Sequence, residues 1–256
     1  MAPAGLDRAL AWKFRFEAVG LNPRKAWRAA LSKQMRDALV FSRIEHLPSE
    51  LRTNLGWVID VGANIGQWMS GLMAITQVNR IEVFEPNPEA FEILKSRFGN
   101  CRNVHLHNLA VGDRAGTVDL NVTRSSDLSS LLTPGNTLTE QYGVDLAEVV
   151  KQERVSVTTL DEIIPEDVYI DLIKVDVQGF EHSVLLGARE TLKRTRALLI
   201  EANFVSHYEK DGTFGSLHEQ LTNDLGFSFW DISPPYRGIE KQALWTDAVF
   251  LNRSLQ

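Results

Sequence analysis

The chain has 256 residues, 44% of them hydrophobic, and a formal net charge of −6. This length and apolar content suit one domain with a sizeable core and an appendage, and the acidic balance disfavours a general nucleic-acid-binding protein, which needs a basic surface to neutralise phosphates. The single cysteine, Cys101, excludes an internal disulfide and has no second cysteine with which to form a zinc site.

The N-terminal part of the chain differs in charge from the rest. Residues 1–43 hold nine Lys and Arg against three Asp and Glu, whereas residues 44–256 hold 18 against 30. Asn22-Pro23 is a typical helix start, and apolar residues then recur at helical spacing, so we expect a helix near 23–45. We divide the chain into a basic, mainly helical arm, residues 1–50, and a ligand-binding domain, residues 51–256.

The arm suits three roles. Its basic and aromatic residues could cap the sheet of the domain, form a homodimer contact, or rest on an anionic membrane as a peripheral contact. No apolar run in the sequence approaches the roughly 20 residues of a membrane span, and the N-terminus lacks the apolar core of a signal peptide. We therefore expect a cytoplasmic protein.

From Trp57 onward, short apolar strands alternate with helices, which is the pattern of a parallel α/β sheet. Strands are expected at residues 57–61, 80–85, 103–107, 171–176 and 197–202. Helices are expected at residues 65–76, 87–98 and 181–193.

Two regions depart from this alternation. Apolar and polar residues alternate in two runs, Thr117–Val122 and Val155–Thr159, which lie on either side of a polar stretch. This pattern predicts an antiparallel insertion before the fourth core strand. Near the C-terminus, strands at 227–232 and 246–251 follow a helix. Its start is predicted at a capping box, Ser216–Glu219, and its end at Gly226.

The stretch VIDVGANIG, residues 58–66, is the first candidate for a ligand site. In doubly wound sheets, ligands bind beyond the carboxyl ends of the strands. Gly62 and Gly66 allow close approach of the backbone to a ligand, and the following helix offers free N–H groups. Glu85, at the end of the second expected strand, can accept hydrogen bonds from both hydroxyls of a ribose. Together these residues predict an adenosine-type ligand.

The loop does not fit a dinucleotide. A pyrophosphate is seated by a G-x-G-x-x-G turn, but here the pattern is D-x-G-x-x-x-G, with Asn64 in place of a glycine. Asp60 would repel a pyrophosphate but suit an ammonium or sulfonium group. S-adenosylmethionine has both cations, a ribose and no phosphate, so it is the predicted cofactor.

Several separated blocks resemble FkbM-type S-adenosylmethionine-dependent methyltransferases over roughly residues 55–251. These blocks are VIDVGANIGQW, VFEPNPEAFEIL, NLAVGD, SSLL, TLDEI, IKVDVQGFEHSVLLGA, LIEAN and DAVFLN. The resemblance implies a class I methyltransferase, Rossmann-like fold: a seven-stranded, mostly parallel sheet with its last strand antiparallel and helices on both faces. It also implies methylation of a hydroxyl on a sugar, glycolipid or related secondary metabolite. Because residues 44–256 are acidic, we expect no nucleic-acid partner.

Matched residue by residue, the resemblance implies four groups of cofactor-binding residues. They are a loop, an acid that binds the ribose hydroxyls together with the residues after it, a segment that contacts the adenine, and an acid beside the methyl group. These cofactor-binding residues are Asp60, Gly62, Ala63, Asn64, Gly66, Glu85, Pro86, Asn87, Asn108, Leu109, Ala110 and Asp176. At position 178 the family usually has Glu, whereas this chain has Gln178.

Transfer to an alcohol requires a base that takes the hydroxyl proton as the bond forms. The catalytic candidates are Asp176, His207 and Glu181, with Glu201 and His182 also near strand ends. Each has an ordinary structural alternative, such as holding the methionine ammonium for Asp176, a helix-dipole contact for Glu181 or a solvated loop position for His207. The sequence singles out no one base.

Two questions stay open at this stage. Asp176, Glu201 and Asn203 are oxygen ligands that could orient a diol through a divalent cation, although we favour transfer without a metal. The alternatives to hydroxyl methylation are a methyltransferase acting on protein or RNA, and a cofactor-binding module without transfer activity. A nicotinamide dehydrogenase would need the missing third glycine.

Overall fold

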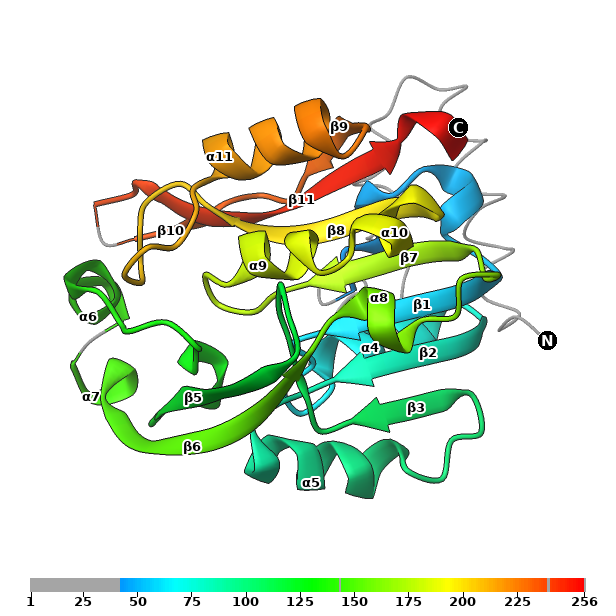
Figure 1. The fold of residues 1–256 in the computed structure, drawn as a ribbon. Helices are drawn as coiled ribbons and strands as arrows, with labels where there is room; N and C mark the ends of the chain where they lie inside the picture. Colours follow the sequence, from blue (N-terminus) through cyan, green and yellow to red (C-terminus); the bar gives the residue numbers. More distant parts are fainter. Residues whose placement is uncertain (1–41, 143, 239, 256) are drawn as a thin grey trace.

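The computed structural model describes residues 42–142, 144–238 and 240–255. In these residues the main sheet has eight strands in the order β10-β11-β8-β7-β1-β2-β3, with β9 also paired to β11 (Figure 1). The five parallel strands are β1 (Leu55–Val61), β2 (Val78–Phe84), β3 (Val104–His107), β7 (Ile170–Val175) and β8 (Thr195–Asn203). The antiparallel strands are β9 (Phe227–Ile232), β10 (Tyr236–Arg237) and β11 (Ala243–Asn252).

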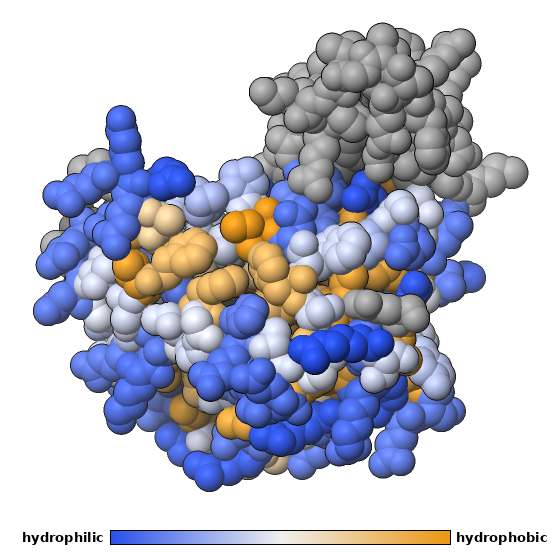
Figure 2. Space-filling view, turned by 90° about the horizontal axis from the view of Figure 1, so that it is seen from above, coloured by the Kyte–Doolittle hydropathy of each residue, from blue (hydrophilic) through white to orange (hydrophobic). Residues whose placement is uncertain are grey.

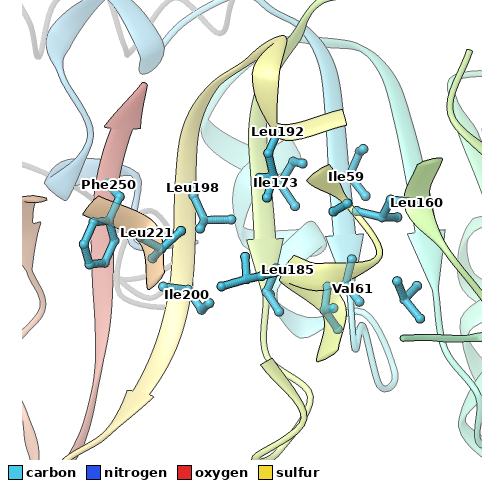
Figure 3. Close-up of a cluster of buried hydrophobic side chains, with 14 of the residues drawn as sticks. Ile59, Val61, Leu160, Ile173, Leu185, Leu192, Leu198, Ile200, Leu221 and Phe250 are labelled. Carbon is cyan, nitrogen blue, oxygen red and sulfur yellow. The ribbon is translucent and has the colours of Figure 1, made fainter. Parts of the chain in front are cut away.

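Both faces of this sheet are apolar and each is covered by helices. Successive residues of a strand point to opposite faces, so Val58 joins one buried cluster and Ile59 the other. The first cluster packs under α4 (Gln67–Ile75) and α5 (Pro88–Phe98). The second cluster, shown in Figure 3, packs under α8 (Leu160–Ile163), α9 (Glu181–Leu186), α10 (Arg189–Lys193), α11 (Phe214–Glu219) and the π-helical turn Gln220–Asp224.

A separate sheet of three strands forms the predicted insertion. β5 (Gly116–Thr123) and β6 (Val149–Thr158) are antiparallel, and β4 (Ala110–Val111) joins β6 in parallel. Between β5 and β6 lie the 3-10 turn η3 (Ser126–Leu128), α6 (Asn136–Tyr142) and α7 (Val144–Ala147). The prediction of an antiparallel insertion before the fourth core strand is confirmed.

Three predicted elements differ in detail. The helix expected at 181–193 is two helices, α9 and α10, with the break at Gly187 and Ala188, and a Cβ at Gly187 would lie 1.9 Å from the Gly112 carbonyl oxygen. The capping box is Thr213 with Ser216, so the helix begins three residues earlier than predicted. The predicted seven-stranded sheet gains an eighth strand, the two-residue β10 on the free edge of β11.

Most of the arm, including most of the helix predicted at 23–45, lies outside the described residues. The described part holds two 3-10 turns, Ile44–His46 and Ser49–Leu51, whose apolar side chains join the first cluster on the sheet. Between residues 42 and 255, no described helix combines the length and apolarity needed to cross a lipid bilayer.

Some apolar side chains are exposed at the surface of the protein. Figure 2 shows apolar residues gathered across the middle of one face, with hydrophilic residues around them. The rings of Phe204, Phe214, Phe229 and Phe250 form a chain with centroids 5.6–6.0 Å apart, and Phe204 and Phe229 are exposed. This chain of rings joins α11 to β9 and β11.

Candidate active site

A cavity of about 430 Å³ lies beyond the carboxyl ends of the parallel strands, where a ligand was predicted. The loops after β1, β2 and β7 line one part of it, and the turn η3 of the insertion lines another. Arg43, Glu201, Trp245 and Asp247 complete the lining. A volume of this size is typical of sites for small molecules and cofactors.

The structure brings most of the predicted residues together. Those lining the cavity are Gly62, Ala63, Asn64, Glu85, Pro86, Leu109, Ala110, Asp176 and His207. Those outside its lining are Asp60, Gly66, Asn87, Asn108 and Glu181.

The two loop glycines are required by packing within the protein itself. Gly62 has a φ of +79°, and a Cβ there would lie 1.8 Å from the Asp176 carbonyl oxygen. Gly66 has a φ of +82°, and its Cβ would meet the rings and methyls of Phe98 and Leu94 at 2.7–2.8 Å. Left-handed backbone and close neighbours both favour glycine. The loop therefore has glycines for a reason other than the predicted approach to a ligand.

Glu85 is held between two loops while its carboxylate faces the cavity. Its Oε2 accepts a hydrogen bond from the Asn64 N–H at 2.7 Å, and its Oε1 accepts one from the Asn87 N–H at 2.8 Å. Burial raises the pKa of Glu85 to about 7, against the opposing effect of these two hydrogen bonds. Each oxygen keeps a further lone pair, so the carboxylate can still accept the two hydroxyl hydrogens of a ribose.

Asn87 and Asn108 support the loop that carries Glu85. The Asn87 side chain caps α5 by accepting the Glu89 N–H at 3.0 Å. The Asn108 amide donates to the backbone carbonyl oxygens of Glu85 and Pro86 at 2.9 and 3.1 Å. Both residues therefore fix the loop, although the resemblance had implied that they bind the cofactor.

A buried lysine, which the sequence analysis missed, neutralises Asp60. Asp60 is fully buried, and the Nζ of Lys174 lies 3.5 Å from its Oδ1 and 3.2 Å from Oδ2 of Asp176. Burial lowers the pKa of Lys174, but the two carboxylates outweigh burial and raise it. Asp60 was predicted to face a cation of the ligand, whereas in the structure the nearby cation is Lys174. The sequence did contain a sign of this ion pair, because a lysine inside the apolar strand Ile170–Val175 would need a buried partner for its charge.

Three carboxyl groups form a row across β7, β8 and β11. In the antiparallel pairing of β11 with β8, Asp247 lies opposite Glu201. In the parallel pairing of β7 with β8, Val175 lies opposite Ile200, and Asp176 and Glu201 are the next residues along the two segments. Arg43 pairs with Asp247 at 2.7 Å. Burial, with the neighbouring charges of Asp176, Glu181 and Asp247, raises the pKa of Glu201 well above its ordinary value. We call Asp176, Glu201 and Asp247 the carboxyl row.

Glu181 holds the loop after β7, and it does not reach the cavity. Its Oε1 accepts the N–H groups of Val177 and Gly179 at 3.1 and 3.2 Å, and the side chain is buried. Burial raises its pKa to about 7. A carboxylate that binds two backbone donors away from the cavity is placed to fix the loop, and this position gives no support to the catalytic role predicted for Glu181.

His207 lies in the cavity lining and is buried. Its Nδ1 is 3.0 Å from Oδ1 of Asn203, an atom that can only accept, so Nδ1 carries the proton and Nε2 is the basic nitrogen. Burial lowers its pKa, which keeps the ring neutral. His182, by contrast, contacts Gln220 and Ser216.

The lining chemistry fits a cationic ligand without phosphates. The carboxyl groups are those of Glu85, Asp127, Asp176, Glu201 and Asp247, and the cations are Arg43 and Lys174. A pyrophosphate would be repelled here, whereas a sulfonium or ammonium would be attracted. The apolar side chains of Leu109, Ala110 and Leu131 offer a surface for a flat base. Among the described residues, no three His, Cys, Asp or Glu side chains are placed to hold a metal ion.

Two comparisons of the sequence with known proteins find methyltransferases. A family model described as the methyltransferase FkbM domain matches residues 60–229. The 2-O-methyltransferase NoeI of Sinorhizobium fredii is 30% identical over 196 residues, covering 73% of this chain and 77% of that protein.

A solved structure of an FkbM methyltransferase matches this chain with a TM-score above 0.5, and it shows the fold. The FkbM methyltransferase of Methylobacillus flagellatus superposes with a TM-score of 0.53 at 16% identity, over 88% of this chain and 50% of that one, so this chain spans half its length. Fibrillarin of Aeropyrum pernix, solved with natively bound S-adenosylmethionine, gives a TM-score of 0.46 at 12% identity over 85% and 76% of the two chains.

Proposed function

The chain belongs to the FkbM methyltransferase family, and from this premise we propose that it methylates a hydroxyl oxygen of a sugar, a glycolipid or a related secondary metabolite. The methyl donor of this family is S-adenosylmethionine. The carboxyl row is the observation that carries the proposal, because it places hydrogen-bond acceptors for neighbouring hydroxyl groups along one side of the cavity. The name of the relative, a 2-O-methyltransferase, also favours oxygen as the acceptor atom.

The cofactor side of the cavity is assigned to residues that the sequence singled out. Glu85 would accept the ribose hydroxyls, and the loop Gly62–Asn64 would lie against the adenosine or methionine part of the cofactor. Leu109 and Ala110 would contact the adenine ring. When bound, S-adenosylmethionine supplies a methyl group activated by the sulfonium charge. The protein then has to orient the acceptor hydroxyl and accept its proton.

Asp176 is the proposed proton acceptor. It lines the cavity, its Oδ2 is 3.2 Å from the Lys174 ammonium, and its side chain is 30% exposed, so a substrate can reach it. Asp176 would take the proton that the acceptor hydroxyl loses when its oxygen is methylated. His207, with a neutral ring in the same lining, is the second candidate.

The acceptor class is tested by transfer of a labelled methyl group. The purified protein, incubated with labelled S-adenosylmethionine and cell extracts fractionated into polysaccharide, lipid, protein and RNA, should label the carbohydrate or glycolipid fraction. Release of the label as methylated sugar after acid hydrolysis would locate it on a hydroxyl. Label confined to protein or RNA would contradict the proposal and support the alternative acceptor classes.

Cofactor affinity should depend on pH through Glu85. Because burial raises the pKa of this carboxyl to about 7, it is mainly protonated at pH 6 and ionised at pH 8. The ionised form accepts both ribose hydroxyls, so the affinity for S-adenosylhomocysteine should rise by up to about tenfold per pH unit below pH 7 and level off above it.

The matched control for this effect is Glu85→Gln. This variant should bind about 1.5–3 kcal/mol more weakly at pH 8, the scale of a hydrogen bond to a charged group, and its affinity should stay flat across the range. Calorimetric titrations at pH 6, 7 and 8 provide the measurement. Equal pH dependence in the two proteins would place the ribose elsewhere.

A further inference from the structure

We propose that Gln178 is a positioning residue for methyl transfer, whose amide shares its two hydrogens between Asp176 and Glu201 and so keeps Asp176 the ionised member of the pair. Its Nε2 lies 2.9 Å from Oδ1 of Asp176 and 3.2 Å from Oε1 of Glu201. The inference rests on the proposed function, in which Asp176 accepts the hydroxyl proton.

The hydrogen-bond partners fix the orientation of this amide. Turned the other way, the amide oxygen would face Oδ1 of Asp176, and this contact between two acceptors would be repulsive. In the observed orientation, Oε1 of Gln178 accepts from the Tyr208 hydroxyl at 3.0 Å. A primary amide has two N–H hydrogens, which matches the two carboxyl oxygens beside it.

The two carboxyl groups do not receive equal stabilisation. Asp176 has a donor at each oxygen, Lys174 at Oδ2 and Gln178 at Oδ1. Among the described residues, Glu201 forms no ion pair with Lys or Arg, and it lies in the row between Asp176 and Asp247. Two donors favour the charged form of Asp176, whereas burial between like charges favours a proton on Glu201.

The loop around Gln178 is built to hold this side chain in place. Gln178 has a φ of +55° and the following Gly179 a φ of +96°. The Ser130 hydroxyl donates to the Gln178 carbonyl oxygen at 2.6 Å, and Glu181 accepts the N–H groups on either side. A left-handed backbone at a residue other than glycine is unfavourable and persists where the surroundings fix it, commonly at functional sites.

Charged groups surround the pair on every side. Those on the packed elements are Asp60 on β1, Lys174 on β7, Asp247 on β11, Arg43 before the first 3-10 turn, Glu181 on α9 and His207 after β8. A carboxylate at position 178 would add a third acid in direct contact with Asp176 and Glu201. The three would have to share protons, so Asp176 would ionise only at higher pH.

Gln178→Glu tests the inference, with Gln178→Met as a neutral variant of similar size that cannot donate. In Gln178→Glu, we expect the acidic limb of the pH profile of kcat/KM to move up by about one pH unit or more. Transfer at pH 6 should then fall at least about tenfold and recover towards pH 9. Gln178→Met removes a donor from Asp176 without adding a charge, so it should move the limb up by less than Gln178→Glu does. A purely structural role would lower the rate without moving the limb.

A second measurement does not depend on transfer. In the free protein with ¹³C-labelled carboxyl groups, the Glu201 signal, assigned by its loss in Glu201→Gln, should titrate at higher pH in both Gln178 variants than in the wild type. Unchanged titration of Glu201 together with an unmoved acidic limb would overturn the inference. If the wild-type protein labels no hydroxyl acceptor, the proposed function fails, and the carboxyl titration still decides whether the amide controls the pair.

Discussion

Replacing Asp176 by asparagine should lower kcat by about 10²–10⁴-fold, the usual contribution of a general base. The carboxamide has nearly the same shape as the carboxylate but cannot take the hydroxyl proton. Lys174 keeps Asp60 as a partner at 3.5 Å, so the buried charge remains compensated in the variant. The affinity for S-adenosylhomocysteine should therefore change little, and the loss should appear in single-turnover methyl transfer.

Two further variants separate the two candidate bases. His207→Gln removes the basic Nε2 from the cavity lining, and Asp119→Asn, on an exposed strand of the insertion with a side chain 54% exposed, is the matched control for an acid-to-amide change. We expect the control to keep wild-type activity. A loss of less than tenfold in Asp176→Asn, combined with a loss of 10² or more in His207→Gln, would move the role of base to His207.

The sequence predicted the parts of this molecule whose signals are local. Buried strands such as Leu55–Val61 and Ile170–Val175 appear in the sequence as apolar runs, and the insertion strands appear as runs that alternate apolar and polar residues. Glu85 was found because it is the last residue of a predicted strand. Asp176 was found for the same reason, and both line the cavity.

Some residues of the site could not be predicted from the sequence, because they reach it through contacts between distant parts of the chain. Asp247 reaches the carboxyl row through the antiparallel register of β11 with β8, and Arg43 reaches it from the start of the described chain. No spacing rule connects residues 43, 201 and 247. Glu181 shows the opposite problem, because an acid that opens a helix looks the same in sequence whether it faces a cavity or, as here, binds a loop.

Gln178 illustrates how a single substitution is misread without geometry. From the sequence alone, glutamine in place of the family's usual glutamate means one carboxylate fewer at the site. In the structure its amide provides two donors to carboxyl oxygens, which a glutamate could provide only when protonated, and then only one. The substitution therefore changes the charge balance of the site, in addition to the number of its acids.

Replacing Lys174 by methionine should destabilise the protein by about 3–5 kcal/mol, the usual cost of leaving a buried charge without its partner. Lys174 is the register partner of Asp60, which is fully buried, and its ammonium also lies 3.2 Å from Asp176 and donates to the Gly62 carbonyl oxygen at 3.1 Å. Methionine fills much of the same volume, so lost charge rather than lost packing should dominate. Urea denaturation followed by tryptophan fluorescence gives the free energy of unfolding.

The pH dependence of this loss identifies its cause. Burial already raises the pKa of Asp60, with Lys174 opposing the rise, so without Lys174 the pKa should rise further. An acid whose pKa is higher in the folded than in the unfolded state binds more protons when folded, and stability then falls as the pH rises through that window. The loss in free energy of unfolding caused by Lys174→Met should therefore be smallest near pH 4 and grow towards pH 7.

The double variant Asp60→Asn, Lys174→Met should recover part of the stability, since no unpaired charge remains at position 60. A deficit that is constant with pH and persists in the double variant would attribute the effect to packing and contradict the charge argument.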